Sequence, residues 1–176
     1  MTAPPISDQL AEWSRVNGFA LTPNSSTGAA LFSSGPGGEV RYYLRAAPDG
    51  GFTLTSAQRA SAEQFELHAT SMSVMERHLM AWFGRLYRSG HQLQRLPTFR
   101  TQDDLAPGYT IVAGDPEGSF ELRDRSGALI ARAHGKLSSI STFVRLSHLL
   151  ESSLSVIRRS YESEDGSPLF GIQDKT

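Results

Sequence analysis

Cysteine is absent from this 176-residue sequence. Disulfide bonds, cysteine nucleophiles and zinc or iron–sulfur sites built from thiolates are therefore excluded. Lysine is nearly absent as well, since of 17 basic residues only Lys136 and Lys175 are lysine. Arginine suits bidentate contacts at protein interfaces, but codon usage explains this bias more simply than function does.

Long hydrophobic runs and a strong net charge are also missing. No stretch of about 18 apolar residues occurs, and the start of the chain has no basic region followed by an apolar one. We therefore expect no membrane segment, no membrane partner and a cytoplasmic protein. The 17 Lys and Arg nearly balance 18 Asp and Glu, for a net charge of -1. This balance does not favour binding to nucleic acid or to an anionic membrane.

The chain is long enough to fold without a disulfide or a metal ion. A chain of this length buries roughly 70% of its unfolded surface. Its 39% hydrophobic and 20% charged residues are typical of globular proteins. We expect one domain over residues 1–176, with a frayed tail at 172–176.

The first half of the sequence predicts a helix followed by a β-meander. Ser7 can cap a helix whose Leu10, Trp13 and Val16 fall on one face. Apolar and polar residues then alternate in four segments, at 29–33, 39–45, 52–55 and 64–68. The turns between these segments contain glycine and proline and are too short for parallel connections. The segments are therefore expected to form antiparallel strands.

The strongest helix is predicted over residues 73–90. Ser73 is its expected N-cap, with Glu76 as the second member of a capping box. His78 lies in the apolar stripe of this helix and is interpreted as a hydrogen-bonded core histidine. The stripe is expected to be buried against the sheet, in particular at Leu79, Trp82, Phe83 and Leu86.

The second half of the sequence repeats the order of strands followed by a helix. A second meander is predicted at 109–112, 120–123 and 128–133, and a last helix at about 141–161. The expected fold class is therefore α+β, with antiparallel β-meanders packed with three main helices.

Metal sites and acid–base sites need side chains that converge. On a helix a ligand pair lies three or four residues apart, and among the five histidines only His148, with Glu151, meets this spacing. This weak signal leaves open a small metal- or ligand-dependent enzyme, or an adaptor domain, that uses these two residues. Because no Gly-x-Ser-x-Gly or His-Glu-x-x-His motif occurs, we expect no enzyme, no catalytic residues, no metal ligands and no cofactor.

One predicted strand carries arginine and tyrosine side chains on one of its faces. Arg41, Tyr43 and Arg45 alternate along it and could stack on nucleic-acid bases. Glu63 and Glu66, in a neighbouring segment, could instead neutralise the arginines across the sheet. With a net charge near zero, a solvated or protein-facing surface is favoured over a nucleic-acid-binding sheet.

A series of short motifs runs along residues 10–170. They are Glu-Trp at 12–13, Gly-Phe at 18–19, Gly-Glu-Val-Arg-Tyr-Tyr at 38–43, Arg-Ala at 59–60, Glu-Gln-Phe-Glu-Leu at 63–67, Met-Glu-Arg-His-Leu at 75–79, Phe-Gly at 83–84, Leu-Ala-Pro-Gly-Tyr at 105–109, Leu-Ser-His-Leu-Leu at 146–150 and Asp-Gly-Ser-Pro-Leu-Phe at 165–170. Each alone is explained by a turn, a cap or a core stripe. Their number and order resemble actinobacterial immunity proteins of the kind that neutralises the tuberculosis necrotizing toxin.

The resemblance implies an α+β antitoxin that binds the catalytic domain of a secreted toxin and blocks its hydrolysis of NAD+. A cleft that binds NAD+ must accept a pyrophosphate, which favours acidic residues on exposed turns of the inhibitor. The segment 59–64, with Glu66 and the link 68–71, is the first choice for the interface. The hairpin tip at 35–38 and the arginine–tyrosine strand face come second. The expected partner-binding residues are Arg59, Glu63, Gln64, Glu66, His68, Arg41, Tyr43 and Gly37.

Overall fold

The computed structural model describes residues 3–35, 37–97 and 101–171. The expected frayed tail at 172–176 lies outside these ranges. The described residues form eight strands and four α-helices in an α+β arrangement, which confirms the predicted class. The strands are β1 (Phe19–Thr22), β2 (Ala30–Ser34), β3 (Val40–Ala46), β4 (Phe52–Gln58), β5 (Gln64–Ala69), β6 (Tyr109–Ala113), β7 (Ser119–Asp124) and β8 (Leu129–His134).

Both meanders belong to one antiparallel sheet, with the strand order β1-β2-β3-β4-β5-β8-β7-β6. Sequential strands pair within each meander, as the short turns predict. The two meanders meet where β5 pairs with β8, and the pairs recorded there are His68 with Arg132 and Ala69 with Ala131. The cleft described below lies over this junction.

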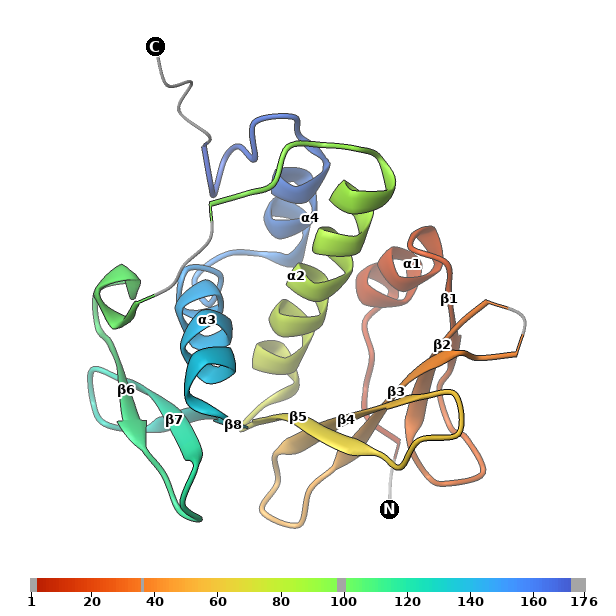
Figure 1. The fold of residues 1–176 in the computed structure, drawn as a ribbon, viewed down its shortest axis with the longest axis horizontal. Helices are drawn as coiled ribbons and strands as arrows, with labels where there is room; N and C mark the ends of the chain where they lie inside the picture. Colours follow the sequence, from red (N-terminus) through yellow and green to blue (C-terminus); the bar gives the residue numbers. More distant parts are fainter. Residues whose placement is uncertain (1–2, 36, 98–100, 172–176) are drawn as a thin grey trace.

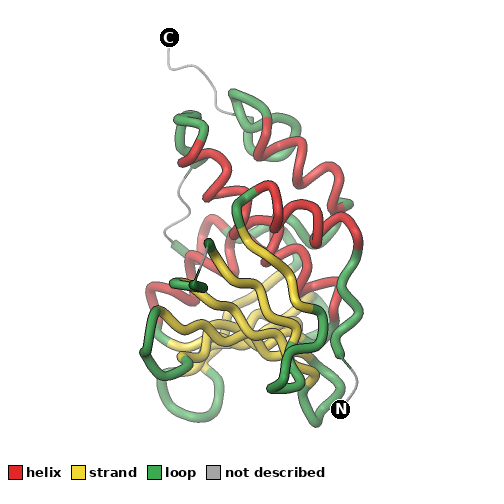
Figure 2. Tube along the Cα trace, turned by 90° about the vertical axis from the view of Figure 1, so that its right-hand side faces the viewer, coloured by secondary structure: helices red, strands yellow, loops and turns green. Residues whose placement is uncertain are grey.

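The helices lie together on one face of this sheet (Figures 1 and 2). They are α1 (Asp8–Val16), α2 (Met72–Gly90), α3 (Lys136–Ser147) and α4 (Leu154–Glu162), with a short 3-10 helix, η1, at Gln102–Asp104. Figure 1 shows α2 at the centre, rising from the sheet between α1 and α3. Among the described residues no helix is long and apolar enough to cross a lipid bilayer.

The start of α2 differs from the prediction by two residues. Its N-cap is Ser71 rather than Ser73, because Ser71 is still extended at the end of β5 and its hydroxyl reaches the backbone N–H of Val74. Glu76 does not complete a capping box. Its carboxylate accepts a hydrogen bond of 2.7 Å from the backbone N–H of Ser7, the N-cap of α1. Glu76 therefore joins two helices instead of closing one.

The predicted last helix is divided into α3 and α4, so the fold has four main helices within the described residues instead of three. Arg77 of α2 explains where the division falls. Its Nε donates to the carbonyl oxygens of Leu149 and Ser152, at 3.2 and 3.0 Å. A new helix then starts at the N-cap Ser153, whose hydroxyl accepts from the backbone N–H of Val156.

The core lies between the sheet and the helices. Its largest fully buried side chains include Trp13, Phe32, Phe83, Phe143 and Tyr161. The predicted stripe of α2 is only partly correct, because Leu79 and Phe83 are buried whereas Trp82 is half-buried and Leu86 is 37% exposed. The reason is that α2 leaves the sheet toward its C-terminal end (Figure 1), so its last turns face other helices and solvent. On α1, Val16 is likewise 46% exposed.

Candidate functional site

Strand β3 separates its side chains between the two faces of the sheet as predicted. Tyr42 and Leu44 are buried under the helices. Arg41, Tyr43 and Arg45 lie on the opposite face, which none of the described helices covers. The guanidinium carbon of Arg45 lies 5.0 Å from the centre of the Tyr43 ring, a cation–π distance.

Glu63 neutralises Arg45 on this open face. Arg45 Nη1 and Nη2 donate to the two carboxylate oxygens of Glu63 at 2.7 and 2.9 Å, and Thr55 also donates to Glu63. The hydrogen bond from Arg45 is the main reason that the pKa of Glu63 is lowered. The expected pairing of glutamate with the strand arginines is therefore present for Glu63.

Glu66 does not take part in the pairing of Glu63 with Arg45. The register of β4 and β5 shifts between Leu54 and Thr55, so that Leu54 pairs with Leu67, Thr55 pairs with Phe65, and Glu66 is the extra residue. Its carboxylate turns to the helix side, where it accepts a hydrogen bond from Ser56. Burial and the charge of Glu66 raise the pKa of Tyr42 to about 12. Neutralisation of the strand arginines, which the sequence suggested for both glutamates, is therefore not a role of Glu66, whose carboxylate is bonded to Ser56.

Two exposed turns meet at one end of the sheet. Gly37 lies in the β2–β3 turn with a φ of 103°, a conformation that favours glycine, and Arg59 lies in the β4–β5 turn. The backbone N–H of Arg59 donates to the Glu39 carbonyl oxygen at 2.7 Å, and the guanidinium of Arg41 donates to the Arg59 carbonyl oxygen. These bonds hold the two turns in a fixed relation.

His68 lies at the other end of β5 and is 7% exposed. Its Nε2 lies 3.2 Å from Oδ2 of Asp49, and its Nδ1 lies 3.4 Å from Oγ1 of Thr53. Gly51 is also close, since a Cβ at that position would lie 2.7 Å from His68 Cε1. His68 therefore fastens the β3–β4 turn, and it offers little surface to a partner.

A cleft of about 300 Å³ lies between α2 and α3, with β5 and β8 at its base. Gln64 and Glu66 contribute to it, so two of the expected partner-binding residues line this cleft rather than the open face. His78 and Arg85 of α2 and Arg145 of α3 also line it. Burial, followed by the charges of Arg145 and Arg85, lowers the pKa of His78 to about 4. His78 is therefore neutral at physiological pH.

The interpretation of His78 as a hydrogen-bonded core residue is not supported. Its side chain is half-buried in the cleft wall, and within the described part of the chain it forms no hydrogen bond. Arg85 and Arg145 were missed altogether. A sequence signal for them exists, because neither has an acidic residue three or four positions away with which a helical arginine would normally pair.

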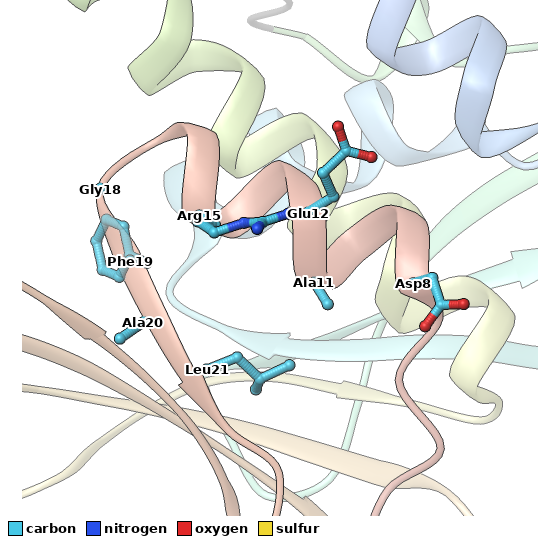
Figure 3. Close-up of a pocket in the computed structure, with 8 residues that line it drawn as sticks. All are labelled: Asp8, Ala11, Glu12, Arg15, Gly18, Phe19, Ala20 and Leu21. Carbon is cyan, nitrogen blue, oxygen red and sulfur yellow. The ribbon is translucent and has the colours of Figure 1, made fainter.

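A second, more open depression of about 670 Å³ lies between α1 and the edge strand β1 (Figure 3). Asp8, Glu12 and Arg15 of α1 line it opposite Phe19 and Leu21. Glu12 also contacts Arg158 of α4 at 3.2 Å. The mixed charges of this depression are balanced by one another, and no converging set of like charges distinguishes its lining residues.

His148 and Glu151 are each bonded to another residue. His148 Nε2 donates to the carbonyl oxygen of Asp104 at 2.8 Å, and Glu151 accepts from the hydroxyl of Tyr109 at 3.1 Å. In residues 3–35, 37–97 and 101–171, no group of three or more histidine, aspartate or glutamate side chains could hold a metal ion. The geometry therefore assigns these two residues to packing of η1 and β6 against the α3–α4 link.

Comparison with known proteins decides the family. A family model described as Immunity protein 61 matches residues 13–169. The chain belongs to the Immunity protein 61 family. The match spans the sheet and the helices, from Trp13 in α1 to Leu169 after α4. It confirms both the predicted resemblance and the role of an immunity protein.

Individual members of this family are similar over nearly their whole length. The immunity factor for TNT of Mycobacterium tuberculosis (strain ATCC 25618 / H37Rv) is 33% identical over 173 residues, which cover 95% of this chain and 93% of the relative. The immunity factor for TNT homolog of Mycobacterium bovis (strain BCG / Pasteur 1173P2) has the same identity and coverage. The solved structure of Rv3902c from M. tuberculosis is 31% identical, with a TM-score of 0.82 and 94% of each chain covered.

Proposed function

We propose that this member of the family is an antitoxin that binds the catalytic domain of a secreted NAD+ glycohydrolase toxin and blocks it in the cytoplasm of the producing cell. The observation that carries the proposal is the similarity to the immunity factor for TNT, where TNT is the tuberculosis necrotizing toxin, over 95% of this chain. The protein acts by binding, without a reaction or a cofactor of its own.

The joined turns at one end of the sheet support a binding role. Inhibition of an enzyme needs an exposed surface that loses little conformational freedom when it binds. The turns that contain Gly37 and Arg59 are exposed, and they are held together by the bonds of Arg59 to Glu39 and Arg41. Glu63 lies just after the second turn and is held by Arg45. The described residues of this surface are therefore exposed and joined to one another by hydrogen bonds within the protein.

We place the toxin interface on this end of the sheet, with Gly37, Arg59 and Glu63 as contact residues and with Arg41 and Tyr43 beside them. Carboxylates and turn carbonyl groups suit a cleft that otherwise binds a pyrophosphate, because such a cleft presents positive charge and backbone donors. On the open face Arg45 is paired with Glu63, and Arg41 donates to a backbone carbonyl. These contacts favour a protein partner over nucleic acid, whose phosphates need unpaired cations.

The test uses the toxin domain encoded beside the gene of this protein. NAD+ hydrolysis by the purified domain is measured with increasing amounts of wild-type protein, and complete inhibition near equal molar amounts is expected. Glu63→Ala and Arg59→Ala should each weaken binding. Glu162→Ala, an exposed change on α4, is the control and should inhibit like wild type. The melting temperature of each variant shows whether it is folded.

The two parts of the proposal fail in different ways. Undiminished hydrolysis with wild-type protein in excess would contradict the antitoxin function toward that toxin. Full inhibition by both Glu63→Ala and Arg59→Ala would leave the function intact and show that the interface lies elsewhere. An interface residue selected only for exposure has a modest chance of being a hot spot, since fewer than about 30% of contact residues contribute strongly. Both variants are therefore needed.

A further inference from the structure

The cleft between α2 and α3 has the junction of β5 and β8 at its base. The recorded pairs between β5 and β8 are at residues 68–69 and 131–132. Further along, Phe65 of β5 and His134 of β8 both line the cleft, with ring centres 4.9 Å apart. Helices α2 and α3 form the walls of this space of about 300 Å³, and β5 and β8 form its base.

Three nitrogen-bearing side chains line this space, two from α2 and one from α3. His78 and Arg85 lie seven residues apart on α2, about two turns, and therefore share a face. Arg145 comes from α3. Burial and then the positive charges of Arg145 and Arg85 lower the pKa of His78, and the pKa of Arg145 is itself lowered by burial and by Arg85. All three line the same cleft, where the charges of Arg85 and Arg145 act on each other and disfavour protonation of His78.

No opposite charge compensates for this repulsion within the described residues. Arg85 and Arg145 form no ion pair and no side-chain hydrogen bond there, in contrast to Arg123 and Arg132, which share Glu121. Among the residues that line the cleft the acidic one is Glu66, which is bonded to Ser56 and acts on Tyr42 rather than on the arginines. Two arginines that line one cleft without a counter-charge leave donors and positive charge for an anion, and partly buried Arg145 gains most from such a partner.

We propose that the α2–α3 cleft binds an oxyanion, a carboxylate or a phosphate group, held between Arg85 and Arg145. The planar guanidinium groups suit both anions, because each can donate two parallel hydrogen bonds to them. Neutral His78 has one ring N–H with which to donate a third. The volume admits a small organic acid or an acidic side chain of a bound protein. Binding of a free acid is independent of the proposed antitoxin function, whereas binding of a toxin side chain rests on it.

The first arm of the test measures free anions. The protein is titrated at neutral pH with inorganic phosphate and with citrate, against sodium chloride of equal ionic strength, while the NMR signal of the His78 ring is followed. Saturable shifts specific to the oxyanions are expected, together with an increase in the pKa of His78 when the bound anion offsets the arginine charges. Arg85→Gln and Arg145→Gln should each weaken binding about tenfold or more.

Matched variants separate a site from general attraction of anions. Arg159→Gln removes an exposed arginine on α4 and should leave binding unchanged. Glu66→Gln removes the negative charge in the cleft and should strengthen it. Arg85 is exposed, so Arg85→Gln keeps the test valid if Arg145→Gln fails to fold. Equal oxyanion binding in wild type and in Arg85→Gln would identify adventitious binding and overturn the proposal.

The second arm identifies a protein source of the anion. If phosphate and citrate do not bind, but Arg85→Gln weakens binding to the toxin domain about tenfold while Arg159→Gln does not, the oxyanion is a side chain of the toxin. If neither free anion binds and toxin binding is absent or insensitive to Arg85→Gln, the proposal is overturned. Loss of the antitoxin function alone would not produce this result, because the free-anion arm needs no toxin.

Discussion

The ring of Tyr161 in α4 lies directly on the backbone of Gly84 in α2. A Cβ placed on Gly84 would lie 2.2 Å from Cγ of Tyr161, well inside van der Waals contact. Tyr161 is 1% exposed, and burial raises its pKa to about 12, so the ring remains neutral in the folded protein. The close approach of α4 to α2 therefore depends on the absence of a side chain at position 84.

Gly84→Ala should destabilise the protein although alanine is the better helix former. Alanine favours a helix by about 1 kcal/mol over glycine, but the clash with buried Tyr161 should cost about 1–3 kcal/mol and prevail because neither helix can move freely. Gly90→Ala, at the end of α2 with no atom within 4 Å of the added Cβ, is the control. Urea unfolding that shows Gly84→Ala to be as stable as Gly90→Ala would contradict this packing.

Arg88 should be essential for stability although it forms no ion pair within the described part of the chain. It is 3% exposed, and its guanidinium donates to the carbonyl oxygens of Gln94, Tyr161 and Glu164, at 2.6, 3.1 and 2.8 Å in their shortest bonds. Each carbonyl left without a donor costs about 1–3 kcal/mol. Arg88→Lys keeps the charge but loses the several N–H donors of the planar guanidinium group. It should therefore lower the melting temperature strongly, whereas exposed Arg159→Lys should not. Equal melting temperatures of the two variants would show that the hydrogen bonds of the Arg88 guanidinium contribute little to stability.

Substitutions along α2 should follow burial rather than hydrophobicity. Phe83→Ala removes a fully buried ring and should cost about 3–5 kcal/mol. Trp82→Ala should cost less, because the indole is half-buried although it contacts Tyr42 and Phe19 at ring distances of 4.5 and 5.6 Å. Leu86→Ala should change stability by about 0.5 kcal/mol or less. A larger loss for Leu86 than for Trp82 in denaturant melts would mean that this face of α2 is assigned wrongly.

Glu121 should make part of the stability depend on acid pH. Hydrogen bonds from Arg132 and Arg123 lower its pKa in the folded protein below the ordinary value of 4.5. The contribution is present above that value and is lost as the pH falls through the folded pKa. Glu121→Gln should therefore be less stable than wild type near neutral pH but lose less stability on acidification, as measured by urea unfolding at several pH values. Exposed Glu117→Gln should keep the wild-type slope; parallel curves for Glu121→Gln and wild type would refute the assignment.

His148 and Glu151 should not be required for inhibition of the toxin. Each is bonded to another element, His148 to the Asp104 carbonyl oxygen and Glu151 to the Tyr109 hydroxyl. His148→Ala and Glu151→Ala should therefore reduce thermal stability modestly and leave inhibition unchanged, and dialysis against a chelator should have no effect. Loss of inhibition in either variant while its melting temperature is preserved, or inhibition that depends on a metal ion, would instead support the metalloprotein alternative.

Local patterns were sufficient to predict most of the strands and the positions of their turns. Alternation along β3 placed Arg41 and Tyr43 opposite Tyr42 and Leu44, because side chains of consecutive strand residues point to opposite faces. The same rule does not hold along the whole of β5, since the bulge at Glu66 adds one residue and reverses the alternation there. A bulge depends on how two strands pair, so it cannot be predicted from the sequence of one strand alone.

The sequence by itself determined the α+β class, the antiparallel meanders and the family, because these depend on patterns that neighbouring residues create together. Only the tertiary structure decided that β5 joins β8, that Arg77 bonds the link between α3 and α4, and that Arg85 and Arg145 line one cleft. Each of these contacts links residues far apart in the chain. Their partners are selected by the packing of whole helices and strands, since local periodicity specifies which face is buried but not what lies against it.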